Sequence, residues 1–415
     1  MNKKKLWKKI FSGFSVLALT GCVYLPSGAD VSDRNAPQAL ESSAFVFSFG
    51  VNRWGTNLTP PNIVLFYNAE KDEWIRYKGK GSDESAIAYD REEKTLYFFD
   101  HSTDYILTQK NLEKVKHDGR DPKIISHAFV VEKDGQKSVL SSKNGGFKED
   151  GSGYDWTFAL SSTGHRESWP HHQYVQSIAQ CEDGSVWYAL SASAHTPEIP
   201  DAAPHTKEPL YIYKIYPQVD GGQHGKIQLD TPAIPEFSSI TCANGKLYTI
   251  MDTYREGVDV ELGGGPEDFS GSVLVSYDTN NGDSTYTPIS GDLSTRISEE
   301  NLNPDYGFLG YYRDGLWWLN GSGAIVRTDV NTANNETVFT DEITKETGQA
   351  GFYEIYENYI FVFDILDDKM KVTRYNLDTR VKESEKFISG VYPLLGPRNF
   401  PMDIEITNLD ALLSL

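Results

Sequence analysis

The most informative absences in this 415-residue chain are of basic charge and of long apolar runs. Aspartates and glutamates number 59 against 39 lysines and arginines, which gives a net charge of −20. Because so acidic a chain repels nucleic acid and anionic lipid head groups, we expect no nucleic-acid partner. No apolar run after residue 22 is long enough to span a bilayer, so the body of the chain offers no transmembrane segment.

Catalytic and nucleotide-binding motifs are also missing. The chain has no SxDxGxTW box of the sialidase type, no consistent GH–WD pair of WD40 blades, no GxSxG nucleophile elbow and no phosphate loop. The glycines at 221–222 and 263–265 belong to no strand–helix unit, and we interpret them as turn glycines. No motif therefore identifies a reaction.

The chain does contain a repeated hairpin. Residues 177–190, SIAQCEDGSVWYAL, read as a strand, an Asp-Gly turn and a strand rich in aromatic and β-branched residues. Asp-Gly is typical of a type I′ turn, whose two central residues have positive φ. The pattern returns at Asn244-Gly245 and Asp314-Gly315, and more loosely near Asp134, Arg91 and Asn358. A second strand–turn–strand unit follows each hairpin, starting at Ile63, Tyr105, Trp156, Tyr211, Val273, Ala324 and Lys371.

Four short strands that recur roughly every 40–70 residues are typical of β-propeller blades, which stack around an axis because one blade cannot bury both its faces. Seven second units predict an all-β propeller of seven four-stranded blades, with eight blades as the alternative. Residues 44–50 lack an inner partner, and residues 401–407 are left over after the seventh blade. We expect these two segments to pair, which closes the ring and removes an exposed edge.

The first 22 residues have the features of a secretion signal. Five lysines precede the apolar run 10–19, which ends in the sequence Leu19-Thr20-Gly21-Cys22. This sequence resembles the bacterial lipobox, and the resemblance covers only the signal peptide, residues 1–21. It implies cleavage before Cys22 and transfer of diacylglycerol to the Cys22 sulfur, and further acylation such as palmitate would make the anchor stable. Loss of the five lysines would leave a net charge of −25.

The expected mature protein is therefore an extracytoplasmic lipoprotein at the cell membrane or the outer membrane, with the bilayer as a partner. Residues 22–43 contain Pro26, Gly28 and Pro37 and have no periodic pattern, so we expect a flexible tether. Residues 44–415 are expected to form a single propeller domain.

Cys181 and Cys242 occupy equivalent positions just before the first turn of two neighbouring blades. An oxidising exterior permits a disulfide. Equivalent positions on neighbouring blades usually lie beyond the Cα separation of about 7 Å that a disulfide tolerates. The favoured prediction is two separate buried thiols, and a disulfide is the alternative.

One face of the ring carries nearly all the insertions. With strands named A to D from inner to outer, the A–B and C–D turns are short, whereas the B–C and D–A connections are long. Because long loops on a rigid scaffold concentrate binding residues, we expect a single working face there. The insertions are residues 51–61, 142–153, 191–209 and 252–271 between B and C, and 117–123, 169–174 and 290–304 between D and A.

Candidate residues on that face support three kinds of site. An imidazole of His171, His172 or His195 is a candidate general base, with Arg255 or Arg296 neutralising an acid group. Carboxylates of the loop at 252–271 are weak candidates for Ca²⁺, and a solvated acidic loop is the favoured alternative. These are Asp252, Glu256, Asp259 and Glu261. Candidate ligand-binding residues, with aromatic rings that could stack on sugars, are Trp54, Trp169, His205 and Tyr254.

The favoured function is a non-catalytic anchored propeller whose loop face binds a partner protein, a glycan or a small ligand. One alternative is an anchored enzyme, such as a polysaccharide lyase or hydrolase. The other is a scaffold in envelope assembly, which rests on fold analogy alone.

Overall fold

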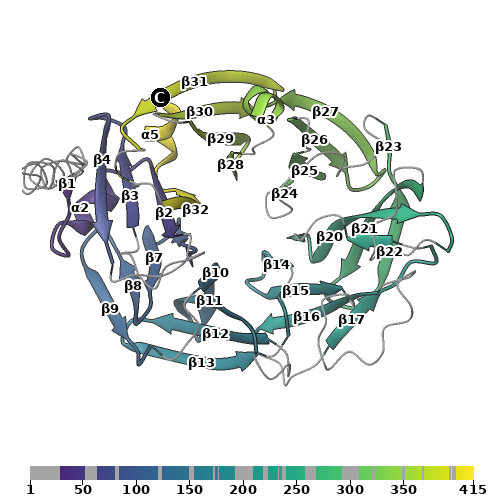
Figure 1. Cartoon of the computed structure of the whole chain (residues 1–415), viewed down its shortest axis with the longest axis horizontal. Coiled ribbons are helices and arrows are strands. Elements are labelled where there is room, and N and C mark those ends of the chain that lie inside the picture. Colours follow the sequence, from purple (N-terminus) through teal and green to yellow (C-terminus); the bar gives the residue numbers. More distant parts are fainter. Residues whose placement is uncertain are drawn as a thin grey trace, which may run out of the picture.

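A computed structural model of the chain describes residues 29–51, 63–79, 84–119, 124–148, 154–171, 173–175, 177–191, 209–217, 223–231, 233–235, 240–257, 268–291, 308–319, 323–347, 351–366, 369–391, 394 and 399–415. Their strands form seven sheets in a ring around a central opening (Figure 1). The predicted seven-bladed propeller is confirmed, and the eight-bladed alternative is wrong.

The first four blades have these strands, from inner to outer. Blade 1 has β32 (Asn399–Ile406), β2 (Phe45–Val51), β3 (Ile63–Asn68) and β4 (Glu73–Lys78). Blade 2 has β6 (Ala88–Asp90), β7 (Thr95–Asp100), β8 (Thr103–Leu107) and β9 (Leu112–Lys116). Blade 3 has β10 (Ile124–Lys133), β11 (Gln136–Phe147), β12 (Tyr154–Ser162) and β13 (His165–His171), with β5 (Glu84–Ser85) beside β10. Blade 4 has β14 (Ser177–Gln180), β15 (Val186–Ser191), β16 (Leu210–Tyr216) and β17 (Gln223–Ile227).

The other three blades follow the same plan. Blade 5 has two short inner strands, β18 (Ala233–Pro235) and β19 (Thr241–Ala243), then β20 (Lys246–Tyr254), β21 (Phe269–Asp278) and β22 (Ser284–Pro288). Blade 6 has β24 (Phe308–Tyr312), β25 (Gly315–Leu319), β26 (Ala324–Asp329) and β27 (Asn334–Thr340), with β23 (Ser290–Gly291) outside β27. Blade 7 has β28 (Phe352–Tyr356), β29 (Tyr359–Ile365), β30 (Lys369–Asn376) and β31 (Val381–Ser389).

The ring closes by pairing its two ends, as predicted. Strand β32 runs antiparallel to β2, with Phe45 opposite Ile406 and Phe47 opposite Ile404. The Thr407 hydroxyl adds a hydrogen bond of 2.9 Å to the Ser43 carbonyl. The C-terminal strand therefore supplies the inner strand of the N-terminal blade.

The predicted tether is wrong from residue 29 onward. Strand β1 (Ala29–Asp30) pairs in parallel with β4, and Arg76 donates a hydrogen bond of 2.6 Å to the Asp30 carboxylate. Helix α2 (Ala36–Glu41) buries Ala36 and Leu40 against blades 1 and 2. The segment packs because its few apolar residues fall on one face of a six-residue helix. Six residues are too few for the helical periodicity of apolar residues to be recognised in the sequence.

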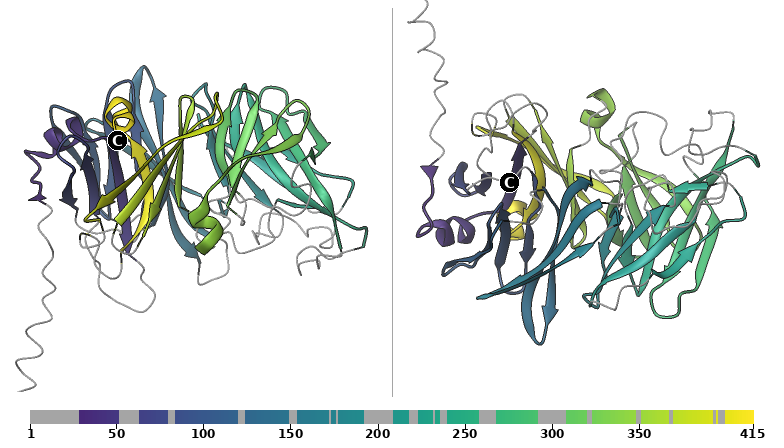
Figure 2. Two further views of the ribbon diagram at one scale, coloured as in Figure 1. Left: turned by 90° about the horizontal axis from the view of Figure 1, so that it is seen from above. Right: turned by 60° about the horizontal axis from the view of Figure 1, so that its bottom comes forward.

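Two further helices lie on opposite faces of the flat ring (Figure 2). Helix α5 (Leu409–Leu413) follows β32, and α3 (Glu342–Thr347) connects blade 6 to blade 7. The face with α3 is thus the face of the D–A connections, and the face with α5 is the face of the short turns. Among the described residues, no helix has both the length and the apolar character needed to cross a membrane.

Large aromatic side chains, among them Trp187, Trp317 and Trp318, fill the spaces between and within blades. Each of these three indoles is at most 2% exposed. The cluster that spans the closure includes Phe45, Phe47 and Phe363, with Phe47 and Phe363 ring centroids 5.8 Å apart. This packing makes the ring a rigid frame for the sites at its surface.

The predicted turns are partly confirmed. Both central residues have positive φ at Asp134-Gly135 and at Asn244-Gly245, as in a type I′ turn. At Asp183-Gly184 only the glycine has positive φ. In blade 6 the two-residue loop is Arg313-Asp314 instead of the predicted Asp314-Gly315, because Tyr312 pairs with Gly315.

Cys181 and Cys242 form a disulfide, so the favoured prediction of separate thiols is wrong. Their Cα atoms are 4.9 Å apart. The estimate of blade separation failed because both residues lie at innermost strands, where neighbouring blades converge on the ring axis. The disulfide therefore ties blade 4 to blade 5 near the central opening.

Candidate anion-binding site between blades 6 and 7

The structure places His171, the described candidate base, at the end of the outer strand β13 and not in a loop. Its half-buried ring packs 5.3 Å from Phe158 and 5.2 Å from Tyr188, measured between ring centroids. Both of these rings belong to the hydrophobic cluster between blades 3 and 4, so His171 packs against that cluster. Four other candidates on the predicted face lie outside the described residues, as does the lipidation candidate Cys22: His172, His195, His205 and Arg296.

Two aromatic candidates for sugar binding are packing residues. Tyr254 is 4% exposed in β20, with its ring centroid 6.3 Å from that of Phe269. Trp169 is half-buried in β13, with its ring centroid 6.2 Å from that of Phe158. Neither ring is positioned as an open platform, and Trp54 lies outside the described residues.

The predicted calcium loop is only partly described. Asp252 is fully buried in β20, where it accepts a hydrogen bond of 2.6 Å from the Ser272 hydroxyl. Glu256 and Arg255 lie in an exposed turn after that strand, whereas Asp259 and Glu261 are not among the described residues. Within the described part of the chain, no group of three or more acidic, histidine or cysteine side chains is arranged to hold a metal ion.

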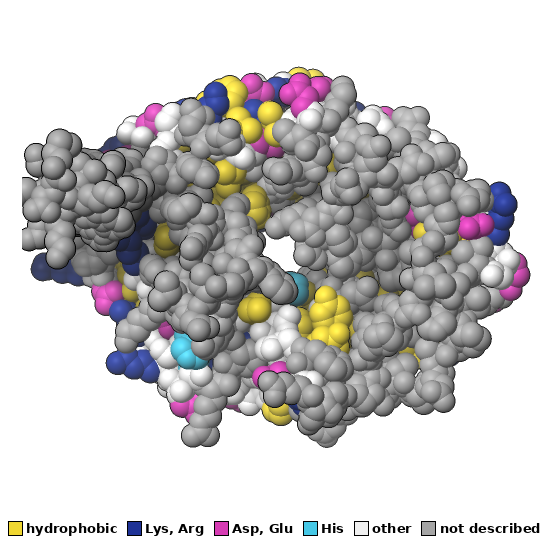
Figure 3. Space-filling view, viewed as in Figure 1, with side chains coloured by type: hydrophobic (Ala, Val, Ile, Leu, Met, Phe, Trp, Pro, Cys, Tyr) yellow, Lys and Arg dark blue, Asp and Glu magenta, His cyan; other side chains and the backbone are white. Residues whose placement is uncertain are grey.

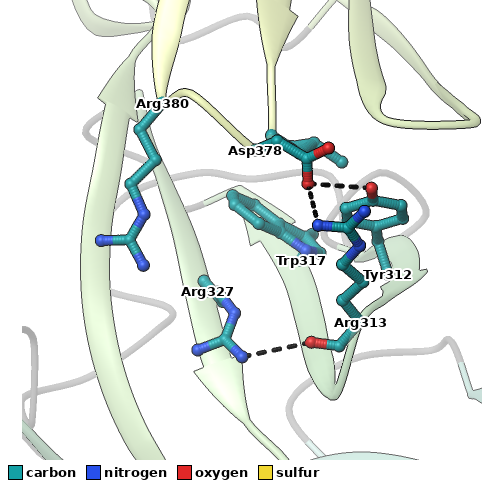
Figure 4. A pocket seen from close by; sticks show the side chains of 7 residues that line it. Tyr312, Arg313, Trp317, Arg327, Asp378 and Arg380 are labelled. Atoms are coloured by element: carbon teal, nitrogen blue, oxygen red, sulfur yellow. Dashed lines mark hydrogen bonds and ion pairs between the residues drawn. The ribbon is translucent and has the colours of Figure 1, made fainter.

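A different site lies on the face of the short turns. A pocket of about 240 Å³ opens at the boundary between blades 6 and 7 (Figure 4). It combines three arginines with two aromatic rings and one carboxylate. The lining residues are Tyr312, Arg313, Trp317, Arg327, Leu377, Asp378 and Arg380. We call it the arginine pocket.

The tight turn of blade 6 gives the pocket its shape. Arg313 and Asp314 have φ values of 44° and 56°, in the left-handed region that residues other than glycine rarely adopt. Arg327 holds this turn from the neighbouring strand, since its Nη2 donates to the main-chain carbonyls of Arg313 and Asp314 over 3.3 and 3.4 Å. The strained turn therefore projects Arg313 toward blade 7 (Figure 4).

Position 315 requires glycine because the side chain of Arg327 crosses it. A Cβ atom at this position would lie 2.6 Å from Nε and 2.9 Å from Cγ of Arg327. Its φ is not positive, so the turn itself does not demand glycine here. The glycine instead makes room for Arg327 to lie flat against the hairpin.

Positive charge is in excess within the pocket. Arg313 pairs with Asp378 at 2.6 Å, and the Tyr312 hydroxyl donates to the same carboxylate over 3.0 Å. Arg327 pairs with Asp329 at 3.1 Å and Arg380 pairs with Glu336, but neither of these carboxylates lines the pocket. Among the described lining residues, three positive charges therefore face one negative charge, and Asp329 and Glu336 compensate Arg327 and Arg380 from outside the lining.

Charged side chains of both signs are mixed around the outer rim of the face shown in Figure 3. Exposed pairs such as Lys133 with Glu167 illustrate this mixture. In the arginine pocket, guanidinium groups outnumber carboxylates among the described lining residues.

The chemistry of the lining suits binding. A guanidinium group stays protonated, offers several donors in a planar fork and has no acceptor, so it recognises carboxylate or phosphate and does not transfer protons. All three described hydrogen bonds of the Arg327 side chain use Nη2, and that of Arg380 uses Nη1. Both groups therefore retain donors for a bound anion.

A second pocket of about 320 Å³ lies at the same blade boundary beside α3. Lys371 lines it, with Nζ 3.0 Å from Asp364 and 3.8 Å from Asp341. Burial raises the pKa of Asp364 to about 6, and the Asp341 charge adds to the rise. Clusters of this kind occur both in active sites and in structural ion networks.

The ring of seven four-stranded blades defines the chain as a β-propeller. A family model described as the YycP β-propeller domain matches residues 70–407. The chain belongs to this family. No curated protein sequence matches it.

Solved structures resemble the chain only at the level of the fold. A structure from a study of two prolyl endopeptidases is 13% identical with a TM-score of 0.41, covering 93% of this chain, and the chain spans about half, 47%, of its length. AztD from Citrobacter koseri is 12% identical with a TM-score of 0.36, covering 87% of this chain and 97% of AztD. Cobalt-substituted Synechocystis ACO is 9% identical with a TM-score of 0.43, covering 88% and 93%. Similarity this distant carries no argument about activity.

Proposed function

We propose that this protein is a lipid-anchored propeller outside the cytoplasm that binds a small anionic ligand in the arginine pocket. One observation carries the proposal. Three guanidinium groups and two aromatic rings line one cavity, with a single carboxylate among them. Arginine is the residue best suited to recognise planar or phosphate-like anions, because its fork of donors matches their oxygens.

Two features support the extracytoplasmic location. The sequence at 19–22 resembles a lipobox, which would place an acylated Cys22 at the start of the mature chain. The disulfide between Cys181 and Cys242 fits an oxidising compartment, because cytosolic proteins seldom keep structural disulfides. The described fold begins at Ala29, so only a few residues separate it from the anchor.

An enzyme remains the second candidate because of the cluster below the second pocket. Asp364, whose pKa burial raises to about 6, lies beside Lys371, which reaches the pocket lining. The arginine pocket favours binding instead, since guanidinium groups are suited to holding anions and its described lining contains no serine, cysteine, histidine or lysine.

A thermal-shift experiment tests the binding proposal. The chain from Val23 to Leu415, which contains every described element, is heated with increasing sulfate at constant ionic strength. A ligand that binds only the native state raises Tm with its concentration. We expect a rise that is lost in Arg327→Gln and Arg380→Gln and kept in Arg255→Gln, an exposed arginine far from the pocket. An equal rise in all four proteins, or no rise, would contradict the proposal.

Fractionation of cells tests the anchor. The full chain should sediment with membranes, and a Cys22→Ser variant should not. A variant that still sediments with membranes would show that Cys22 is not the point of attachment.

A further inference from the structure

We infer that the ligand of the arginine pocket is a small ring compound carrying a phosphate monoester. The inference rests on the proposed function, since it names the ligand class of the same site. It depends on charge, donor geometry, cavity size and the aromatic wall.

The side chains that line the pocket favour a dianion. Among the described lining residues, guanidinium groups outnumber carboxylates by three to one, and Asp329 and Glu336 compensate Arg327 and Arg380 from outside the lining. A phosphate monoester carries about −1.5 to −2 charges at pH 7 and three acceptor oxygens, so it can compete with these carboxylates for the guanidinium groups. A carboxylate, a sulfate ester or a phosphodiester carries one negative charge and would be attracted less strongly.

The donors are arranged for a compact tetrahedral group. Arg327 comes from β26 and Arg380 from the turn before β31, and both lie on one side of the indole of Trp317, while Arg313 and Asp378 lie on the other (Figure 4). A phosphate group between the first two arginines would accept from both forks. Bidentate contacts of this kind are shorter and stronger than neutral hydrogen bonds.

Asp378 acts as an internal competitor for the anion. It occupies Arg313 at 2.6 Å and receives the Tyr312 hydroxyl at 3.0 Å. Both donors belong to the pocket lining, and Arg313 is 69% exposed. A ligand that enters can recruit Arg313 only by replacing this carboxylate, so a dianion has an advantage over a monoanion.

The remaining lining accommodates a ring. The guanidinium carbon of Arg313 lies 5.2 Å from the Tyr312 ring centroid, and Leu377 and Trp317 complete an apolar wall. A volume of about 240 Å³ limits the occupant to a small molecule. A sugar-sized or phenyl-sized ring attached to the phosphate would contact mainly the half-buried Tyr312 ring, because Trp317 and Leu377 are only 2% and 5% exposed.

The ligand should impose its own pH dependence on binding. The described titratable groups around the site include Tyr312 and Asp378 in the lining, Asp329 and Glu336 behind the guanidinium groups, and Asp314 in the turn of Arg313. Burial and Asp378 raise the pKa of Tyr312, and hydrogen bonds from Asn331 and Thr332 outweigh burial and lower the pKa of Asp329. Neither group changes charge between pH 5.5 and 7.5, whereas a phosphate monoester with a second pKa of about 6 does.

Calorimetric titration of the chain from Val23 to Leu415 tests the inference with four probes: inorganic sulfate, inorganic phosphate, phenyl phosphate and phenyl sulfate. At pH 7.5 we expect phenyl phosphate to bind at least tenfold more tightly than phenyl sulfate, and more tightly than inorganic phosphate. At pH 5.5 its affinity should fall about fourfold, following the loss of dianion. Inorganic sulfate is a dianion at both values and should be unaffected.

The outcomes separate the inference from the proposed function. Sulfate binding without preference for phenyl phosphate over phenyl sulfate would overturn the inference and leave the anion site standing. Failure of all four probes would overturn both. A fall in sulfate affinity equal to that of phenyl phosphate at pH 5.5 would assign the pH dependence to the protein and contradict the argument.

Asp378→Asn tests the competitor directly. Removal of this negative charge should tighten the binding of phenyl sulfate several-fold and tighten that of phenyl phosphate less, because a monoanion gains most when Arg313 is released. Asp278→Asn, a change at the half-buried last residue of β21 in blade 5, serves as the matched control and should alter neither affinity. Unchanged affinities in a folded Asp378→Asn protein would show that Asp378 does not compete.

Discussion

The carboxylate of Glu354 accepts a hydrogen bond of 3.0 Å from the main-chain N–H of Ile406, across the boundary where blade 7 meets blade 1. Two more carboxylates repeat this contact at the next boundary, since Asp403 accepts from the Ile87 N–H at 3.0 Å and Glu405 from the Tyr89 N–H at 3.3 Å. Innermost strands have an edge without a strand partner, and these side chains satisfy its donors.

The stability of the ring should fall as pH rises from about 5 to 7.5. Burial raises the pKa of Glu354 to about 7 and that of Asp403 to about 6, and burial with the neighbouring Glu354 charge raises that of Glu405. The native state thus binds more protons than the unfolded state in this window, which makes unfolding easier as pH rises. We expect a higher Tm at pH 5.5 than at 7.5.

Glu405→Gln should reduce that dependence. The amide oxygen can still accept from Tyr89 but carries no charge beside Glu354 and Asp403. We expect the variant to be more stable than the parent at pH 7.5, by about 1.4 kcal/mol for each unit of pKa shift removed. A Tm that rises steadily from pH 5.5 to 7.5 in the parent protein would contradict this assignment.

Asp104→Asn should strongly destabilise the protein. The fully buried Asp104 lies 2.9 Å from Arg166 and 3.5 Å from Lys143, which is 1% exposed. Burial would raise the pKa of Asp104, but His117, Lys143 and Arg166 outweigh burial and hold this pKa well below its usual range. Loss of one partner from such a network costs about 3–5 kcal/mol, which urea unfolding can measure. A cost no larger than that of Asp278→Asn would show that the network is not coupled.

Removal of the disulfide should lower stability without changing the fold. It closes a loop of 61 residues between blades 4 and 5. The chain-entropy model gives about 4 kcal/mol for a loop of this length. The Cys181→Ala/Cys242→Ala variant should unfold at lower urea and lack the bridged peptide in a non-reducing digest. An unchanged urea midpoint would contradict the expectation.

Phe47→Ala tests the closure of the ring. Phe47 is fully buried in β2 and packs against Phe363 of blade 7. Deletion of such a ring costs about 3–5 kcal/mol. Phe387→Ala is the matched control, because that ring is 46% exposed on the outer strand β31 and its loss should cost less than about 1 kcal/mol. Equal losses of unfolding free energy in the two variants would show that ring closure does not depend on the apolar packing around β2 and β32.

The fold was predictable because the strand signals are local. Alternating apolar residues around turns such as Asn244-Gly245 define each hairpin, and the unpaired segments at the two ends define the closure. The disulfide was missed because sequence shows equivalent positions but not how closely innermost strands converge. Helix α2 was missed because its packing depends on blades 1 and 2, which lie elsewhere in the sequence.

The arginine pocket was not predictable from the sequence. Arg313, Arg327 and Arg380 come from a turn, a strand and a second turn in two blades, and no spacing relates them. Loop length favours the opposite face, because the long insertions lie there. Only the one-residue shift of the blade 6 turn, caused by the Tyr312–Gly315 pairing, brings Arg313 beside Asp378.

The central claim is that an anion binds between the arginines of blades 6 and 7. A crystal structure of the chain grown with selenate, whose selenium scatters anomalously, tests it most directly. We expect an anomalous peak in the arginine pocket, within hydrogen-bond distance of the Arg327 and Arg380 guanidinium groups, that is absent from Arg327→Gln/Arg380→Gln crystals. Selenate peaks elsewhere together with an ordered, empty pocket would contradict the claim.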